Sequence, residues 1–216
     1  MSQTYRAVAI DGPAASGKST VAKRLAESLG LVMVNSGAMY RAVTWQVLQE
    51  GIDPENRAAV LEAMSRMRID CGVKNNLSTI AINDRLLTTE IRSAGVNEHV
   101  SKVASIPEVR ESLVAMQRDY LVEYDVVMEG RDIGSVVFPD TPFKLYVSAS
   151  EEVRAARRAK EGESDEVAKR DAQDSNRKAS PLKVADGSIV IDSSDLTIDG
   201  TVEAAREALI KLGWRD

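Results

Sequence analysis

Residues 12–19 read Gly-Pro-Ala-Ala-Ser-Gly-Lys-Ser and match the pattern G-x-x-x-x-G-K-[ST] at every fixed position. The motif follows an apolar run at residues 5–10, which we interpret as a buried strand, and it precedes a run with helical periodicity that begins at Lys18. This order is typical of a loop that wraps phosphate groups. A glycine-rich turn with a chance lysine is the alternative, and it would produce the pattern in on the order of one per cent of chains this long. The motif therefore favours a nucleotide-binding α/β fold.

Each fixed position of the motif has a chemical reason. Gly12 and Gly17 let the backbone bend until successive N–H groups point at phosphate oxygens. We expect Lys18 to reach the β- and γ-phosphates of a nucleotide and the Ser19 hydroxyl to bind Mg²⁺. The predicted nucleotide-binding residues are Gly12, Pro13, Ala14, Ala15, Ser16, Gly17, Lys18, Ser19 and Thr20.

Apolar runs alternate with helical periodicity along the chain, which predicts a parallel sheet covered by helices on both faces. We expect a P-loop three-layer α/β/α fold with a five-stranded parallel sheet. The predicted core strands are residues 5–10, 31–34, 125–129, 143–147 and 188–191. Residues 68–87 differ, because short β-prone pieces alternate there with asparagine-rich turns, and we interpret them as a small antiparallel β insert.

Helix boundaries follow from capping residues. The first helix should begin at Lys18 and end before Gly30. Ser36 is the expected N-cap of a helix over residues 37–50, and Asp53-Pro54 is the expected start of another that runs to residue 67. Helical pattern resumes near Glu90, and further helices are expected over residues 107–123, 151–160, 165–178 and from 201 onward.

Length and composition exclude several classes of protein. With 216 residues, 44% of them hydrophobic, the chain can form one globular domain without disulfides or structural metal. A net charge of −5 argues against a protein that coats nucleic acid or an anionic membrane. One cysteine and one histidine make a zinc cluster implausible. Because no apolar run approaches the length of a membrane span, we expect a cytosolic protein.

Two arginines follow predicted strands and can face the phosphate loop. Arg41 lies beyond the second core strand and Arg131 directly follows the third. In an open parallel sheet, ligands bind at the carboxyl ends of the strands, so both guanidinium groups can converge on one anion in front of Lys18. Either residue alone could equally form a solvated ion pair, but their shared position favours an anion site.

A further basic group surrounds the break at residues 161–163. Arg157 and Arg158 precede it, whereas Arg170, Asp174 and Arg177 follow it at spacings that share one helix face. These residues could form an exposed charged face or a mobile lid that closes over phosphates, and the spacing does not separate the two. No Asn-Lys-x-Asp base-reading motif of GTPases occurs, which leaves a small-molecule kinase as the favoured class.

In combination, these motifs resemble bacterial cytidylate kinases over nearly the whole chain. The segments that carry the resemblance are residues 12–19, 36–41, Ser101, 106–110, 130–140 and 170–177. The resemblance implies MgATP-dependent phosphorylation of CMP or dCMP within one P-loop kinase domain, residues 1–216. It also implies a monophosphate-binding region at residues 36–105, which contains the insert near 68–87, and a lid at residues 157–170. We expect a cytoplasmic monomer that binds neither nucleic acid nor membranes.

The resemblance also assigns roles to individual residues. It implies that Arg41, Arg131 and Arg177 hold the CMP phosphate, that Ser101, Arg110 and Asp132 read cytosine, and that Arg170 and Asp174 hold the sugar hydroxyls. The full set of expected substrate-binding residues is Ser36, Arg41, Ser101, Arg110, Arg131, Asp132, Arg170, Asp174 and Arg177. The expected catalytic residues are Lys18, Arg131, Arg157 and Arg177, and Ser19 is the expected metal ligand.

Two positions depart from the resemblance. Asn35 and Glu129 stand where many members carry aspartate. Two rivals remain at this point: a P-loop kinase for another nucleotide or for an alcohol such as shikimate, and a nucleotide-binding regulatory module without transferase activity. An alcohol acceptor would call for an aspartate base, and none is identifiable from the sequence.

Overall fold

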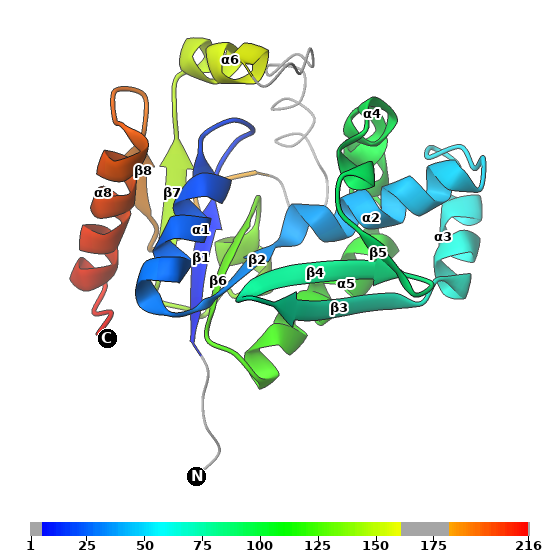
Figure 1. The fold of residues 1–216 in the computed structure, drawn as a ribbon, viewed down its shortest axis with the longest axis horizontal. Coiled ribbons are helices and arrows are strands. Elements are labelled where there is room, and N and C mark those ends of the chain that lie inside the picture. The colour runs from blue at the N-terminus through cyan, green and yellow to red at the C-terminus, as the bar shows by residue number, and fades with distance from the viewer. Residues whose placement is uncertain (1–5, 161–181, 216) are drawn as a thin grey trace.

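The strands form one eight-stranded sheet within residues 6–160 and 182–215, the part of the chain that this computed structural model describes (Figure 1). The strands are β1 (Ala7–Asp11), β2 (Val32–Asn35), β3 (Ile69–Lys74), β4 (Leu77–Ile82), β5 (Arg85–Leu87), β6 (Val126–Gly130), β7 (Lys144–Ser148) and β8 (Ile189–Asp192). Their order is β3-β4-β2-β6-β1-β7-β8, and β5 pairs with β4. The five predicted core strands are all present and parallel, which confirms the predicted fold class.

Strand β1 lies in the middle of the parallel part of the sheet, and all five of its residues are therefore buried. Such a strand reads as a continuous apolar run, not as an alternating one. Its partner β6 pairs Asp11 with Gly130, so the loop after β1 and the segment after β6 leave the sheet side by side. The connections from these two strands run in opposite directions across the sheet, which is the usual position of a ligand crevice.

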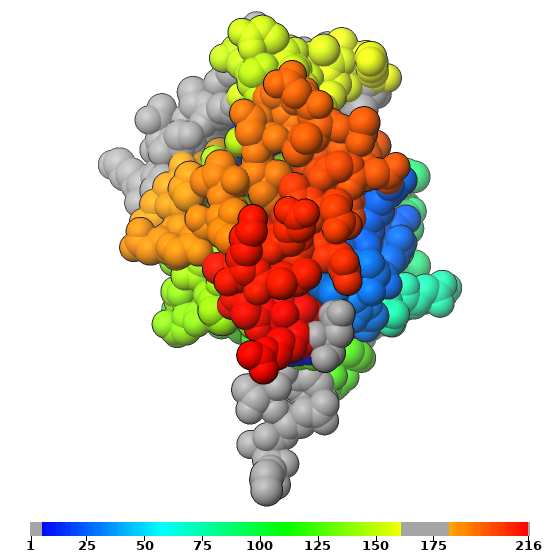
Figure 2. Space-filling view, turned by 90° about the vertical axis from the view of Figure 1, so that its left-hand side faces the viewer, coloured from blue at the N-terminus to red at the C-terminus, as the bar shows by residue number. Residues whose placement is uncertain are grey.

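Helices cover both faces of the sheet. Helices α1 (Lys18–Leu29) and α8 (Ile198–Lys211) pack on one face against Val8 and Ile10, and Figure 2 shows α8 spread over this side of the molecule. Helix α5 (Pro107–Asp119), the 3₁₀ turn η2 (Tyr120–Val122) and the π-helix η3 (Ile133–Val137) pack on the other face against Ala7 and Ala9. Alternate residues of β1 therefore contribute to two separate cores.

The predicted insert is antiparallel, but it is continuous with the main sheet. Strands β3, β4 and β5 pair antiparallel, and β4 then pairs parallel with β2. The two turns of the insert are Asn75-Asn76 and Asn83-Asp84, and all four residues have positive φ, as tight hairpins require. Helices α2 (Ser36–Gln49), α3 (Arg57–Arg66) and α4 (Ala94–Val103) pack with the insert around a third core, to the right in Figure 1.

Two predicted helix starts are wrong. The Asn35 side chain, not Ser36, caps α2 by accepting a hydrogen bond from the N–H of Ala38 at 2.9 Å. Helix α3 begins at Arg57 with Asn56 as its cap, and Asp53 forms a turn before it. Both errors arise because more than one nearby side chain can accept the capping hydrogen bond.

In the carboxyl-terminal half the predicted strands and the helix expected over residues 151–160 are present, whereas α8 begins at Ile198, three residues before the expected start, with Thr197 as its cap. Helix α6 (Glu151–Lys160) lies above the carboxyl end of β7 in Figure 1. The helix expected over residues 165–178, and with it Arg170, Asp174 and Arg177, lies outside the described residues. Among residues 6–160 and 182–215, no helix combines the length and the apolar character needed to cross a bilayer.

Candidate active site

A cleft of about 810 Å³ opens at the carboxyl ends of β1, β2 and β6. Its walls come from the phosphate loop, the start of α2, helix α4 and the segment that follows β6. Of the predicted site residues that the structure describes, twelve line it: Ala14, Ala15, Gly17, Lys18, Ser19, Thr20, Ser36, Arg41, Ser101, Arg110, Arg131 and Asp132. The structure therefore brings together in one cavity residues that are up to 118 positions apart, from Ala14 to Asp132.

The phosphate loop has the strained backbone that its sequence predicts. A Cβ at Gly12 would lie only 2.1 Å from the carbonyl oxygen of Val147, so no larger residue fits there. Ala15 has a φ of 58°, which is uncommon for a residue with a side chain. Such strain persists only where the surrounding structure enforces it, and it is typical of functional loops. Gly12, Pro13 and Ser16 are not among the residues that line the cleft.

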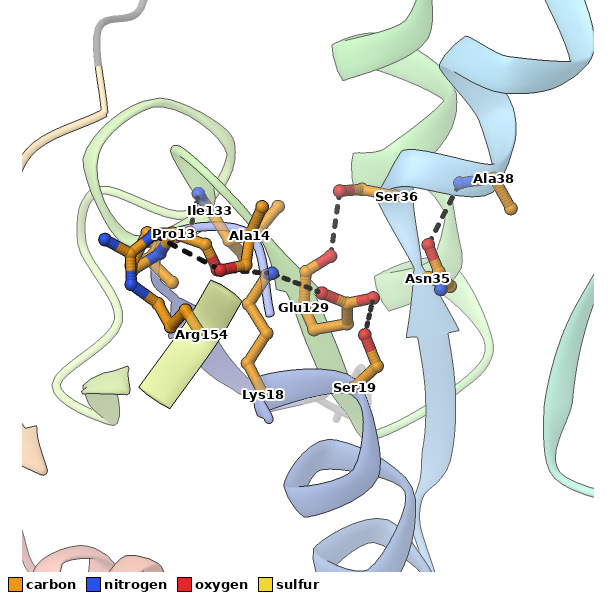
Figure 3. Close-up of polar contacts among 11 residues, drawn as sticks. Pro13, Ala14, Lys18, Ser19, Asn35, Ser36, Ala38, Glu129, Ile133 and Arg154 are labelled. Carbon is orange, nitrogen blue, oxygen red and sulfur yellow. Dashed lines mark hydrogen bonds and ion pairs between the residues drawn. The ribbon is translucent and has the colours of Figure 1, made fainter. Parts of the chain in front are cut away.

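Lys18 is buried at the start of α1, where Figure 3 shows its side chain between the loop and Glu129. Its Nζ donates to the carbonyl oxygen of Pro13 at 3.1 Å and lies 3.9 Å from Oε2 of Glu129. The Ser19 hydroxyl donates to Oε1 of the same carboxylate at 2.9 Å. Glu129 thus holds both polar side chains of the motif at the end of β6.

This arrangement fits a magnesium ion that binds together with a nucleotide. A hydroxyl and a carboxylate supply the oxygen ligands that Mg²⁺ prefers, and nucleotide phosphates and waters commonly complete its shell. Groups of three or more His, Cys, Asp or Glu side chains with metal-site geometry are absent from the described residues. The donor set therefore suits an ion shared with a phosphate ligand better than a dedicated protein cage.

The opposite side of the cleft carries Arg41, whose guanidinium is held in place by two acceptors. Its Nη1 donates to the carbonyl oxygen of Ile91 at 3.1 Å and to Oδ1 of Asn97 at 2.6 Å. Both acceptors are neutral oxygen atoms, and these two hydrogen bonds help to orient the guanidinium. Asn97 was not predicted as a site residue, since an asparagine within a helix carries no distinctive signal.

Ser36 fastens the start of α2 to the end of β6. Its hydroxyl donates to the carbonyl oxygen of Glu129 at 2.8 Å. A Cβ at Gly130 would lie 2.5 Å from the Ser36 oxygen, so the approach of these two segments depends on glycine. The contact brings the helix that carries Arg41 close to the segment that carries Arg131.

Arg110 and Asp132 form a buried ion pair in the wall of the cleft. Their side chains are only 5% and 7% exposed, respectively. The Arg110 guanidinium also donates to the carbonyl oxygen of Ala104 at 3.2 Å and lies 5.2 Å from the centre of the Tyr40 ring. A buried ion pair stabilises a fold weakly because desolvation opposes the attraction, so its position in a ligand cleft points to recognition.

Helix α6 contacts the phosphate loop through arginines. Arg157 donates to the Ser193 hydroxyl at 3.1 Å and to the Ser193 carbonyl oxygen at 2.8 Å. Arg154 donates to the carbonyl oxygen of Ala14 at 3.4 Å. Arg158 lines the cleft, whereas Arg157 does not. The catalytic role expected for Arg157 stays a prediction, and its contacts here are with protein backbone and Ser193.

With the geometry established, comparison with known proteins identifies the family. Residues 8–211 match the family profile described as cytidylate kinase. The chain belongs to the cytidylate kinase family. A cytidylate kinase of Clostridium botulinum strain Langeland is 42% identical over 207 residues, which cover 91% of this chain and 94% of the relative. One from Caldanaerobacter subterraneus is 43% identical and covers 94% of each chain, and one from Streptococcus thermophilus is 41% identical and covers 95% and 96%.

Solved structures support the fold. A sugar kinase from Janibacter superposes with a TM-score of 0.53 at 18% sequence identity, over 95% of each chain. A gluconokinase from Sinorhizobium meliloti superposes with a TM-score of 0.52 at 15% identity, over 97% of this chain and 94% of the other. At these identities the likeness concerns the fold alone. Membership of the cytidylate kinase family makes the chain a nucleoside monophosphate kinase, a phosphotransferase that uses ATP.

Asp11 is a second residue that the sequence analysis missed. It ends β1 immediately before the phosphate loop, and it is 3% exposed. Burial raises its pKa to about 6, against two backbone hydrogen bonds from Gly134 and Ile133 that lower it. A signal was present in the sequence, since a carboxylate ends an otherwise apolar run before a glycine.

Proposed function

We propose that this chain transfers the γ-phosphoryl group of MgATP to CMP or dCMP, which yields ADP with CDP or dCDP. The observation that carries the proposal is the single cleft that joins Lys18 and Ser19 of the phosphate loop to Arg41, Arg131 and the Arg110–Asp132 pair. A donor site and an anion site in one cavity favour direct transfer between two phosphorylated ligands.

On the donor side, the backbone of residues 12–17 and the N-terminus of α1 bind the phosphates. Lys18 moves from Pro13 and Glu129 to the transferring group, where its charge is most useful as negative charge spreads in the transition state. Ser19 and Glu129 would hold Mg²⁺, which when bound neutralises phosphate charge. Glu129 is suitably placed for this role, because its carboxylate already accepts a hydrogen bond from the Ser19 hydroxyl at 2.9 Å.

On the acceptor side, Arg41, Arg131 and Arg177 hold the monophosphate. A phosphate monoester with a second pKa near 6 is already largely dianionic at pH 7, so the reaction needs no general base. The chemical problem is to bring two polyanions together, and a set of fixed guanidinium groups addresses it. The expected products follow from in-line attack of the acceptor oxygen on the γ-phosphorus.

Base selection is assigned to Ser101, Arg110 and Asp132, and sugar contacts to Arg170 and Asp174. The Asp132 carboxylate, held by Arg110, can accept a hydrogen bond from the exocyclic amine of cytosine. Uracil presents a carbonyl oxygen at that position, which would leave two acceptors facing each other. This arrangement favours CMP over UMP.

Residues 157–170 are assigned to a lid that closes over the phosphates and excludes water, and residues 36–105 to the monophosphate-binding region of a single domain. Arg158 supports this assignment because its side chain already lines the cleft from the last turn of α6. We expect the enzyme to act in the cytoplasm as a monomer.

A panel of acceptors tests the proposal. Purified protein is incubated with ATP, Mg²⁺ and one acceptor at a time, and ADP and the phosphorylated product are measured. The panel holds CMP, dCMP, UMP, AMP, shikimate and gluconate. We expect CMP and dCMP to give the highest kcat/KM, and UMP to be at least about tenfold poorer, as expected for a misplaced buried acceptor pair.

Each alternative has its own signature in the same panel. Preferential use of an alcohol would identify a small-molecule kinase with another acceptor. Nucleotide binding without ADP formation with any acceptor would identify a regulatory module. Either result would refute transfer to CMP.

A further inference from the structure

The acceptor residues Arg131 and Asp132 stand on a short irregular segment between β6 and β7. After Asp132 the backbone forms the π-helix η3, Ile133–Val137, a rare geometry that occurs mostly as single turns and frequently at functional sites. Intrinsic stability cannot hold one turn of π-helix, because nucleating a single turn is unfavourable. Side chains from other elements must therefore hold it.

One end of the segment is held by the Asp11 carboxylate. Its Oδ1 accepts a hydrogen bond from the N–H of Ile133, and its Oδ2 accepts one from the N–H of Gly134, both at 2.8 Å. The first of these two bonds reaches the labelled Ile133 nitrogen in Figure 3. Because both oxygens are used, this carboxylate fixes the position and the orientation of two consecutive peptide groups that directly follow Asp132.

The other end of the segment is held by two cations. Arg118 on α5 donates to the carbonyl oxygens of Val136 and Val137 at 2.8 and 2.9 Å. Lys144 on β7 donates to the carbonyl oxygen of Pro139 at 2.6 Å. A carboxylate at the N–H end and cations at the carbonyl end complement the dipole of the turn.

There is little free space around the Asp11 carboxylate. A Cβ at Gly134 would lie 3.3 Å from Oδ2 of Asp11 and 3.3 Å from the Lys144 stem, so glycine permits the close approach. Burial and, to a smaller extent, the charge of Asp132 disfavour the charged form of Asp11, whereas the two backbone hydrogen bonds and the nearby Lys18 favour it. A charge retained against its own desolvation is unexpected if the position served packing alone.

We propose that Asp11 is a positioning residue of the acceptor site, whose carboxylate fixes the backbone at Ile133 and Gly134 and thereby directs Arg131 and Asp132 into the cleft. The proposal rests on the function given above for the acceptor, CMP. It adds a distinct role for β1: the strand that delivers the phosphate loop also organises the acceptor site through its last side chain.

The variant Asp11→Asn tests this role. The amide keeps the shape of the side chain, but its NH₂ group faces a backbone N–H and cannot accept the second hydrogen bond. We expect the KM for CMP to rise at least about tenfold, as loss of a hydrogen bond to a charged group implies. The KM for ATP should change less than about threefold, because the phosphate loop keeps its own backbone contacts.

Asp125→Asn provides a matched control. Asp125 lies directly before β6, at the opposite end of the parallel strands, where it accepts hydrogen bonds from the N–H and the guanidinium of Arg6. The same change of chemistry there should leave both KM values within about twofold of the wild type. Melting temperatures of both variants separate general destabilisation from the change in KM.

Two outcomes would overturn the proposal. An unchanged KM for CMP in Asp11→Asn would show that the carboxylate does not organise the acceptor site, and equal increases for CMP and ATP would place its effect in the phosphate loop. If Asp11→Asn does not fold, Gly134→Ala perturbs the same contact from the other side and must reproduce the selective loss for CMP. The wild-type rate with CMP, measured in parallel, tests the proposed function separately; if another acceptor is used, the same ratios are measured with it.

Discussion

Lys18 is a buried ammonium whose contacts in the ligand-free chain include the carbonyl oxygen of Pro13 and the carboxylate of Glu129. Neither contact closes a core, so removal of the side chain should leave the fold intact. In Lys18→Ala we expect kcat to fall by about 10²–10⁴, since a fixed cation at the transferring phosphoryl group contributes that much. Steady-state ADP release with CMP measures it.

Lys211→Ala is the matched control for this prediction. Lys211 is an exposed residue at the end of α8, away from the cleft, and its loss should change neither kcat nor KM. A Lys18→Ala enzyme with a rate near that of the control would contradict the role of Lys18 in transfer.

The raised pKa of Asp11 predicts that the stability of the fold depends on pH. Its pKa in the folded chain is about 6, above the ordinary 3.8, so the folded state retains a proton that the unfolded state has released. This favourable contribution is complete below pH 3.8 and disappears as the pH rises through 6. Asp11→Asn lacks the titration, so its free energy of unfolding relative to the wild type should rise by about 2 kcal/mol between pH 4 and pH 7.

Urea unfolding of both proteins at pH 4.5, 5.5 and 7 measures this difference. All other titrating groups are common to the two proteins, so their contributions cancel. A difference that does not vary with pH would mean that Asp11 has an ordinary pKa in the folded chain.

At the scale of the element, helix α2 depends on a cap that the sequence pattern misassigned. Asn35 accepts the hydrogen bond from Ala38 that Ser36 was expected to accept, and Ser36 instead donates to the Glu129 carbonyl oxygen. Asn35→Ala should therefore lower the free energy of unfolding by about 1 kcal/mol. Asn35→Asp should preserve it, because a carboxylate also accepts the bond and its charge is favourable at a helix N-terminus.

Chemical denaturation of the two Asn35 variants provides the measurement. Equal losses in the alanine and aspartate variants would show that the cap does not contribute, since only one of them removes the acceptor.

Elements differed in how far local sequence determined them. The five parallel strands were predictable because each is a short apolar run bounded by turn residues, and Gly30 marked the end of α1. The junction of β4 with β2 was not, because strands that are far apart in sequence pair according to how their helices pack. The prediction that Ser36 caps α2 was wrong for a related reason, because the hydroxyl of Ser36 donates instead to β6, 93 residues away.

At the scale of the whole molecule, the chain is acidic overall but basic side chains gather at the cleft. The chain carries −5 overall, yet eight Lys and Arg side chains among the described residues line the cleft. These cations are Lys18, Lys23, Arg24, Arg41, Arg92, Arg110, Arg131 and Arg158. A cavity of this kind concentrates anions and gains stability when they bind.

Ligand binding should therefore raise the melting temperature. At 100 times its Kd, a ligand adds about 2.7 kcal/mol, which corresponds to about 5–10 °C for a chain of this size. We expect shifts of this order for CMP and for ATP, and much smaller shifts for cytidine and adenosine at the same concentrations. Thermal unfolding monitored by fluorescence gives these values, and a shift with cytidine equal to that with CMP would contradict an anion site.

The sequence by itself determined the chemistry of the donor side. The phosphate loop is a contiguous eight-residue motif, so its backbone geometry, Lys18 and Ser19 follow from local constraints. For Arg41 and Arg131 the position after a strand predicted the right edge of the sheet. Their grouping with Arg110 and Asp132 rested on the family resemblance.

Only the tertiary structure decided which side chains hold these groups in place. Glu129 between Lys18 and Ser19, Asn97 beside Arg41 and Asp11 beneath Ile133 all connect segments that lie tens of residues apart. Such contacts depend on strand order and helix packing, which arise from the burial of many side chains together. No local pattern encodes them, because the same carboxylate or amide would suit a solvated turn equally well.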